Sequence, residues 1–73
     1  MNLSEEAYIN LFGENLRKIR KKYNLSQEQL ANDANIPINQ IGRIERGEIS
    51  TTISTLFFIA SALNLSIKDL FDF

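Results

Sequence analysis

Apolar residues recur along the chain at spacings of three and four, which is the period of an α-helix with one buried face. The first such stripe consists of Phe12, Leu16, Ile19 and Tyr23 and predicts a helix over about residues 7–23. Asn24 follows the stripe, and asparagine tolerates the left-handed backbone conformation in which many helices end. The pattern therefore predicts one long helix that stops at residue 24.

A second, shorter helix is predicted directly after this stop. Ser26 is a good N-cap, and Gln29 three residues later completes the pattern of a capping box. Its short apolar face consists of Leu30, Ala31 and Ala34. Asn35 is again a plausible left-handed residue, so the helix is expected to end in a tight turn.

A third helix is predicted over residues 37–46, immediately after that turn. Pro37 suits the first helical position, where its missing N–H group costs nothing, and Gly47 suits the end. Two short helices separated by a tight turn have the spacing of a helix-turn-helix, which here spans about residues 26–46.

Two more helices complete the chain. Thr52 is expected to cap a fourth helix over about 53–63, and Asn64 is expected to stop it. Its inward positions are predicted to be Ile53, Leu56, Ile59, Ala60 and Leu63. Ser66 is expected to begin a last short helix that runs through Phe71. The chain is thus predicted to be an all-α fold of five short helices, in a single domain over residues 1–73.

The third helix has a polar surface that the core does not need. Ile41 and Ile44 define its inner side at 100° per residue. The outward positions are Asn39, Gly42, Arg43 and Arg46, with Ile38 and Gln40 at the flanks. Amide side chains bond bidentately to adenine edges, and arginine bonds to O6 and N7 of guanine. These residues are candidate DNA contacts; the alternative is an ordinary solvated face.

Arg20 and Glu45 are predicted to form an ion pair between the first and third helices. Glu45 lies near the inner edge of the third helix, and Arg20 is the basic residue closest to the apolar stripe of the first. Removing one partner of such a half-buried pair is costly. We therefore expect a structural role for this pair rather than a ligand contact.

Composition excludes several kinds of chemistry. The 73 residues include no Cys and no His, which removes disulfides, zinc thiolate sites and imidazole catalysis. No phosphate-binding glycine loop or convincing carboxylate pair is present, so we expect neither an enzyme nor a cofactor or metal site. No apolar run is long enough to cross a membrane and no signal peptide is evident, which predicts a cytoplasmic protein.

Charge is unevenly distributed, although the net charge is only −1. Five of the eight Lys and Arg residues fall in one block, namely Arg17, Lys18, Arg20, Lys21 and Lys22. Such a block is either a solvated helix face or part of a nucleic-acid footprint.

Two segments together resemble a known family. "LRKIRKKYNLSQEQLANDANIPINQIGRIERG" followed by "TTISTLFFIASALNLSIKDLF" is similar to the Cro/C1-type (Xre-type) helix-turn-helix domain of phage repressors and small bacterial regulators. The resemblance covers about residues 11–71. It implies a lambda-repressor-like fold that binds double-stranded DNA and whose third helix enters the major groove.

The resemblance also implies roles for individual residues. Base contacts map onto Ile38, Asn39 and Arg43, and a phosphate contact maps onto Gln27. If the chain binds DNA, Gln40 at the flank of the third helix is expected to assist in reading bases. Further phosphate contacts are expected from Ser26, Asn32, Arg46 and Thr51. The family's arginine–glutamate pair matches Arg20 and Glu45.

The chain departs from the family pattern at a few positions. Asn24, Asn35 and Asn64 stand where glycine is frequent, and asparagine serves the same left-handed role. Pro37 replaces the usual Ser or Thr cap, which can shift the start of the third helix. Gly42 replaces a frequent serine, which removes one possible contact to DNA.

Exposed aromatic residues predict a partner chain. Phe58 lies roughly opposite the inward stripe of the fourth helix, and the last helix and tail add further apolar residues. The predicted dimer interface, on the helices over about 53–71 and the tail, comprises Phe58, Ile67, Leu70, Phe71 and Phe73.

Two functions compete on this basis. The first is a homodimeric transcriptional regulator on a partly palindromic operator, with no small-molecule ligand; phage or plasmid repressors and restriction–modification controllers both fit. The alternative is a protein-interaction module, such as an antitoxin-like subunit with weak or no DNA binding, which the acidic pI of about 5.3 favours.

Overall fold

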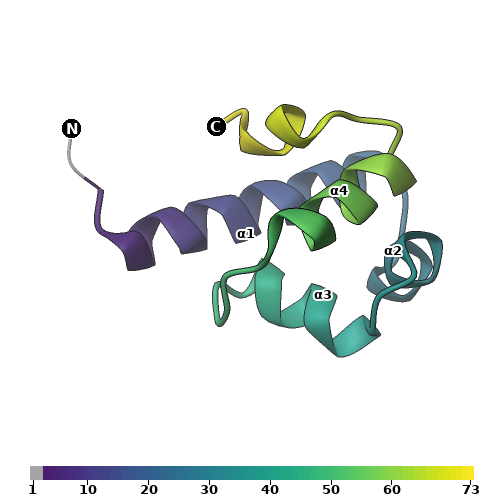
Figure 1. Ribbon diagram of the computed structural model, residues 1–73, viewed down its shortest axis with the longest axis horizontal. Helices are drawn as coiled ribbons and strands as arrows, with labels where there is room; N and C mark the ends of the chain where they lie inside the picture. Colours follow the sequence, from purple (N-terminus) through teal and green to yellow (C-terminus); the bar gives the residue numbers. More distant parts are fainter. Residues whose placement is uncertain (1–2) are drawn as a thin grey trace.

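The computed structural model describes residues 3–73 and is entirely helical (Figure 1). Its elements are α1 (Glu5–Lys22), α2 (Gln27–Ala34), α3 (Ile38–Glu45), α4 (Ile53–Ala62) and η1 (Ile67–Phe71). The all-α prediction is confirmed, and residues 3–73 contain no strand. The fifth element differs from the prediction, because η1 is a 3₁₀ helix rather than an α-helix.

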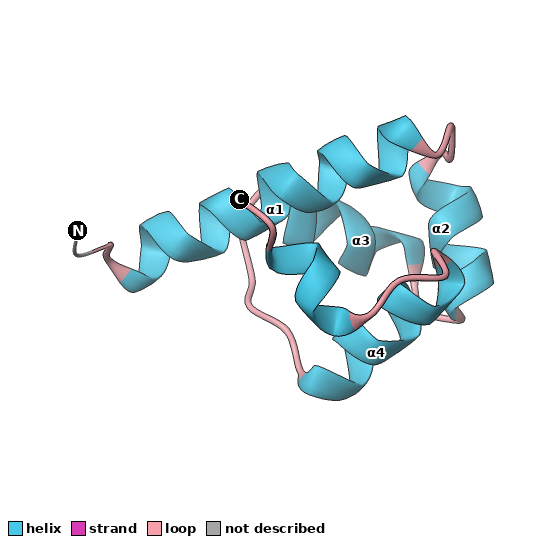
Figure 2. Cartoon of the chain, turned by 90° about the horizontal axis from the view of Figure 1, so that it is seen from above, coloured by secondary structure: helices cyan, strands magenta, loops and turns pink. Residues whose placement is uncertain are grey.

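The long helix α1 supports α3 and η1 directly. Its first turns extend beyond the rest of the molecule in two perpendicular views (Figures 1 and 2). The remainder of α1 packs against α3 and η1, while α2 packs against α3 and α4. Helix α2 lies at the end of the molecule away from the first turns of α1, and α3 lies between them, below α1 (Figure 1).

Helix α1 begins two residues earlier than its apolar stripe predicts. The Ser4 hydroxyl accepts the N–H of Ala7 at 3.1 Å and caps the helix. Glu5 and Glu6 then occupy the first turn, where negative charge is favoured by the helix dipole. Polar capping, which an apolar period does not detect, sets this boundary.

All four α-helices end with the same backbone arrangement, a Schellman motif. The left-handed residues are Asn24, Asn35 and Asn64, with φ of 58°, 58° and 60°, and Gly47, with φ of 72°. The following N–H groups reach back to carbonyls five residues earlier: Leu25 to Arg20, Ile36 to Ala31, Glu48 to Arg43 and Leu65 to Ala60, at 2.8–3.1 Å. The predicted helix stops are confirmed.

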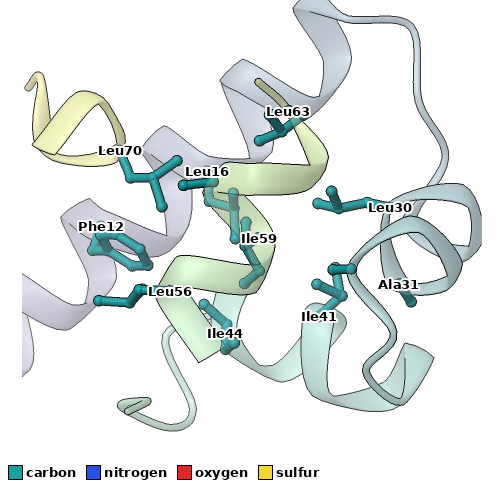
Figure 3. Close-up of a cluster of buried hydrophobic side chains, with 12 residues drawn as sticks. Phe12, Leu16, Leu30, Ala31, Ile41, Ile44, Leu56, Ile59, Leu63 and Leu70 are labelled. Carbon is teal, nitrogen blue, oxygen red and sulfur yellow. The ribbon is translucent and has the colours of Figure 1, made fainter. Parts of the chain in front are cut away.

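One hydrophobic core joins all five helices (Figure 3). Its largest fully buried side chains are Leu16, Leu30, Ile41, Ile44, Ile59 and Leu70. Burial of one such side chain contributes about 1.5–3 kcal/mol to folding. The predicted inner residues of α2 and α3 are all in this core.

Three predicted positions are corrected by the burial pattern. Ile53 is 75% exposed and Tyr23 is 43% exposed, although both continue an apolar period. Each lies at a helix end, beyond the point where neighbouring elements cover the helix. Leu70, predicted to be at a dimer surface, is fully buried, because Asn15 donates a hydrogen bond of 2.8 Å to its carbonyl and helps hold η1 against α1.

Two glycines allow α1 to approach the end of α3 very closely. A Cβ atom at Gly13 would lie 2.3 Å from the carbonyl oxygen of Ile44 and 2.7 Å from that of Glu45. A Cβ atom at Gly47 would overlap the side chain of Asn10. Backbone therefore packs against backbone here, and this contact sets the distance between α1 and α3.

We expect Gly13→Ala to lower the free energy of unfolding by about 1–3 kcal/mol, as overpacked cores do, because the new methyl group meets immobile carbonyl groups. Gly42→Ala is the matched control. Its Cβ would meet only the mobile side-chain ends of Arg46 (2.9 Å) and Gln27 (3.4 Å), and alanine favours helix by about 1 kcal/mol. Urea unfolding of both variants tests this, and an equal loss in both would contradict it.

Candidate nucleic-acid interface

The turn between α2 and α3 places α3 at the surface. Pro37 has φ of −61° and ψ of 140°, so it is the N-cap residue of α3. The sequence prediction that Pro37 is the first helical residue is therefore wrong. An extended ψ keeps Pro37 outside the helix, while its carbonyl accepts the N–H of Gln40 at 3.1 Å. The exposed face of α3 consequently begins at Ile38.

The predicted base-contacting residues fall on the solvent side of α3. Ile38, at 48% exposure, Asn39 and Arg43 are exposed, and Gln40 is half-buried at the flank. Asn39 and Arg43 are four residues apart and therefore neighbours on one side of the helix. Ile41 lies on the other side, in the core. The inner side of α3 is thus anchored while its polar side chains point to solvent.

Gly42 was predicted to point outward, and the structure corrects this. It is buried, and the side-chain ends of Arg46 and Gln27 lie over it. The missing side chain leaves room for these two polar groups. Gly42 thus brings an arginine of α3 and an amide of α2 together.

A buried ion pair fixes α3 to α1. Arg20 Nε donates to Glu45 Oε2 at 2.7 Å, and Arg20 Nη2 donates to Glu45 Oε1 at 3.0 Å. The two residues are only 8% and 6% exposed. Arg20 Nη1 also donates to the carbonyl of Leu25 at 2.8 Å. The hydrogen bond to Glu45 raises the pKa of Arg20, so the guanidinium stays charged.

The same carboxylate binds α2. Gln27 Nε2 donates to Glu45 Oε1 at 3.1 Å, which leaves its second amide hydrogen for another acceptor. The predicted capping box is present, since Ser26 Oγ accepts from the Gln29 N–H at 3.0 Å and Gln29 Oε1 accepts from the Ser26 N–H at 2.7 Å. The first N–H groups of α2 have no helical partner and favour an anion such as phosphate.

Arg17 joins this site, although the sequence placed it only in the basic block. A polar hollow of about 240 Å³ is lined by Arg17, Arg20, Gln27, Glu45 and Arg46. Because Arg20 is paired with Glu45, the groups in this hollow that remain for phosphate oxygens are Arg17, Arg46 and the amide of Gln27. Arg17 is three residues before Arg20, so its place on the same helix face could have been recognised.

Two remaining phosphate candidates differ in position. Asn32 is exposed on α2. The hydroxyl oxygen of Thr51, in contrast, is buried and has no hydrogen-bond partner among residues 3–73. Thr51 lines an apolar hollow of about 160 Å³ beside Phe12 and Leu56. The loop before α4 turns this side chain inward, so the structure does not present Thr51 as a phosphate contact.

Apart from Tyr23, the exposed aromatic residues of the described chain form two pairs rather than one surface. Phe57 and Phe58 on α4 are 56% and 48% exposed, with ring centroids 5.9 Å apart. Phe73, 49% exposed, lies with its ring centroid 5.4 Å from that of Tyr8. Of the other predicted interface residues, Phe71 packs on Phe12 at 4.8 Å, and Ile67 packs against the core.

Other kinds of site find no support in the described chain. Within residues 3–73, no three acidic, cysteine or histidine side chains are grouped to hold a metal ion. None of the helices in the same range has the length and apolarity that a membrane span requires.

Comparison with known proteins gives consistent matches. The helix-turn-helix family model HTH_3 matches residues 16–70. Control protein C.SmaI of Serratia marcescens is 45% identical over 60 residues, covering 82% of this chain and 71% of that protein. Control protein C.BamHI of Bacillus amyloliquefaciens is 41% identical over 64 residues, covering 86% and 79%.

A solved structure shows the same fold. The restriction-modification controller protein C.AhdI from Aeromonas hydrophila superposes with a TM-score of 0.83 at 31% identity. The match covers 85% of this chain and 94% of that chain.

We expect loss of either partner of the buried pair to destabilise the fold more than loss of both. Arg20→Met or Glu45→Leu removes one partner and leaves the charge of the other buried without it, so each should lower the free energy of unfolding by about 3–5 kcal/mol. The double variant Arg20→Met, Glu45→Leu should lose clearly less, because no unpaired charge remains. Urea unfolding measures all three, and a double variant at least as unstable as both single variants would refute this.

Proposed function

The chain belongs to the Cro/C1-type helix-turn-helix family and is a DNA-binding transcriptional regulator, and we propose that it acts as a homodimer on a partly palindromic operator. The proteins of this family are transcriptional regulators. The observation that carries the proposal is the exposed polar face of α3 above a buried, ion-paired inner face.

Sequence would be read by α3 in the major groove. Asn39 would bond to an adenine edge and Arg43 to guanine, while Ile38 would pack on a thymine methyl group. Gln40, half-buried at the flank, assists from the side. Their shared exposed face and the rigid attachment of α3 support these assignments.

Affinity would come from phosphates on either side of α3. The proposed contacts are Ser26, Gln27, Asn32 and Arg46, to which the polar hollow adds Arg17. Because the net charge is −1, attraction to DNA must come from this local concentration of positive charge. Binding is therefore expected to weaken as salt concentration rises.

The dimer would form through the exposed apolar face of α4. Ile53 and Phe57 are four residues apart, and the ring of Phe58 contacts that of Phe57. A two-fold dimer that reads successive major grooves needs its two copies of α3 about 34 Å apart. Phe73 and Tyr8 form a separate apolar pair.

The biological role that we propose is control of a restriction–modification system in the cytoplasm. Two relatives at 45% and 41% identity are control proteins, and the similar structure is that of a restriction-modification controller. The operator would then lie upstream of the regulated genes, and the protein's concentration would set occupancy through dimerisation.

We expect Arg43→Ala and Arg46→Ala to affect DNA binding in different ways. Arg43→Ala should relax preference at one base pair by about 1–3 kcal/mol, because a bidentate guanine contact is lost. Arg46→Ala should weaken binding to all sequences and reduce the salt slope by about one. Fluorescence anisotropy on DNA from upstream of the coding region, at several salt concentrations, separates them. Identical effects of both variants would contradict these assignments.

We expect the double variant Phe57→Ser, Phe58→Ser to dissociate the dimer while remaining helical, because it removes the exposed apolar patch and no buried side chain. Sedimentation analysis should show a dimer for the wild type and a monomer for this variant. Tyr23→Ser, which removes an exposed aromatic side chain from α1, is the control and should remain dimeric. A dimeric double variant would place the interface elsewhere.

A further inference from the structure

Glu48, which follows the left-handed residue at the end of α3, is charged and exposed, unlike the residues in the same position at the other helix ends. At the ends of α1, α2 and α4, the residue after the left-handed position is Leu25, Ile36 or Leu65, each packed against the core. An apolar residue usually accompanies this motif. At the end of α3 the corresponding residue is Glu48, which is exposed. A carboxylate at a helix C-terminus is also disfavoured by the helix dipole.

The side chain of Glu48 contacts both arginines of the exposed α3 face. Its Oε2 accepts a hydrogen bond from Arg46 Nε at 2.5 Å. Its Oε1 lies 3.7 Å from Arg43 Nε. Each carboxylate oxygen thus serves a different arginine, one proposed to read a base and the other to hold a phosphate.

Both contacts are made through Nε, and this choice of atom matters. Within residues 3–73, the Nη1 and Nη2 nitrogens of Arg43 and Arg46 donate no hydrogen bond. These are the nitrogens at the far end of the guanidinium, which can donate in parallel to O6 and N7 of guanine. Glu48 therefore hydrogen-bonds Arg46 and lies within ion-pair distance of Arg43, in both cases at Nε, and leaves the far end of each guanidinium available.

The backbone keeps Glu48 in this position. Its N–H donates to the Arg43 carbonyl at 2.9 Å, within the motif that Gly47 closes with φ of 72°. The hydrogen bond from Arg46 lowers the pKa of Glu48, and the charges of Arg46 and Arg43 act in the same direction against the cost of desolvation. The backbone of Glu48 is thus fixed beside the two arginines, and its carboxylate is charged at neutral pH.

We propose that Glu48 is a specificity-determining positioning residue, a carboxylate bridge that orients Arg43 and Arg46 for the operator and repels other DNA. The inference rests on the proposed function. On the operator, the oriented Arg43 gains its base contact and offsets the negative charge of Glu48. On other sequences that charge near phosphates acts without compensation. Glu48 therefore widens the gap between specific and non-specific binding.

The test compares wild type and Glu48→Gln on two DNA duplexes. One is a duplex that the wild-type protein selects from a random-sequence pool, and the other is the same duplex with its sequence scrambled. We expect Glu48→Gln to bind scrambled DNA more tightly and to lower the ratio of the two affinities about two- to fivefold, the range expected from exposed ion pairs. Circular dichroism should be unchanged, because the side chain is exposed.

Two controls separate orientation from simple charge. Glu14→Gln removes an exposed carboxylate of α1 that takes part in none of the ion pairs, and it should leave the affinity ratio unchanged. In an Arg43→Ala background, Glu48→Gln should no longer lower the ratio. An unchanged ratio for Glu48→Gln alone, or the same fall without Arg43, would overturn the proposal.

The selection step distinguishes this proposal from the proposed function. A pool that yields no preferred sequence overturns the proposed function together with the bridge. A preferred sequence, bound with a ratio that Glu48→Gln does not change, overturns the bridge alone.

Discussion

The carboxylate of Glu45 is the group on which the arrangement of three helices depends. It receives two hydrogen bonds from Arg20 of α1 and one from Gln27 of α2, while itself belonging to the last turn of α3. A negative charge at that end of a helix is disfavoured by the helix dipole. Its burial is tolerated because the guanidinium of Arg20 neutralises it and because its oxygens are hydrogen-bonded. The orientation of the exposed face of α3 follows from this one group.

Local rules explain why much of the fold could be predicted from the sequence. The left-handed asparagines and the capping box at Ser26 act within a few residues, and the Arg20–Glu45 pair follows from helical geometry. Positions that depend on coverage by distant segments could not be predicted. The apolar period includes Ile53, although this residue lies at an uncovered helix end. In the short last helix, the period does not show which apolar residues are buried, and Leu70 was therefore wrongly assigned to the surface.

The interface was harder to predict than the fold, for a physical reason. Its basic and amide residues could be identified by type, yet the inward turn of Thr51 and the approach of side chains over Gly42 depend on tertiary packing. Glu48 was missed because an acidic residue is unexpected beside DNA. A DNA-binding surface, however, combines attraction with repulsion, and discrimination requires both.

Because Gly13 packs against the α3 carbonyls, the attachment of α3 to the domain does not depend on the side chains that are exposed for DNA binding. The scaffold is held by backbone packing, by Ile41 and Ile44, and by a buried ion pair, none of which uses the exposed face. Side chains on that face can therefore be exchanged during evolution without repacking the domain. A lineage of such proteins could acquire new operators through a few surface substitutions, each neutral for folding, while the inner face stays constant.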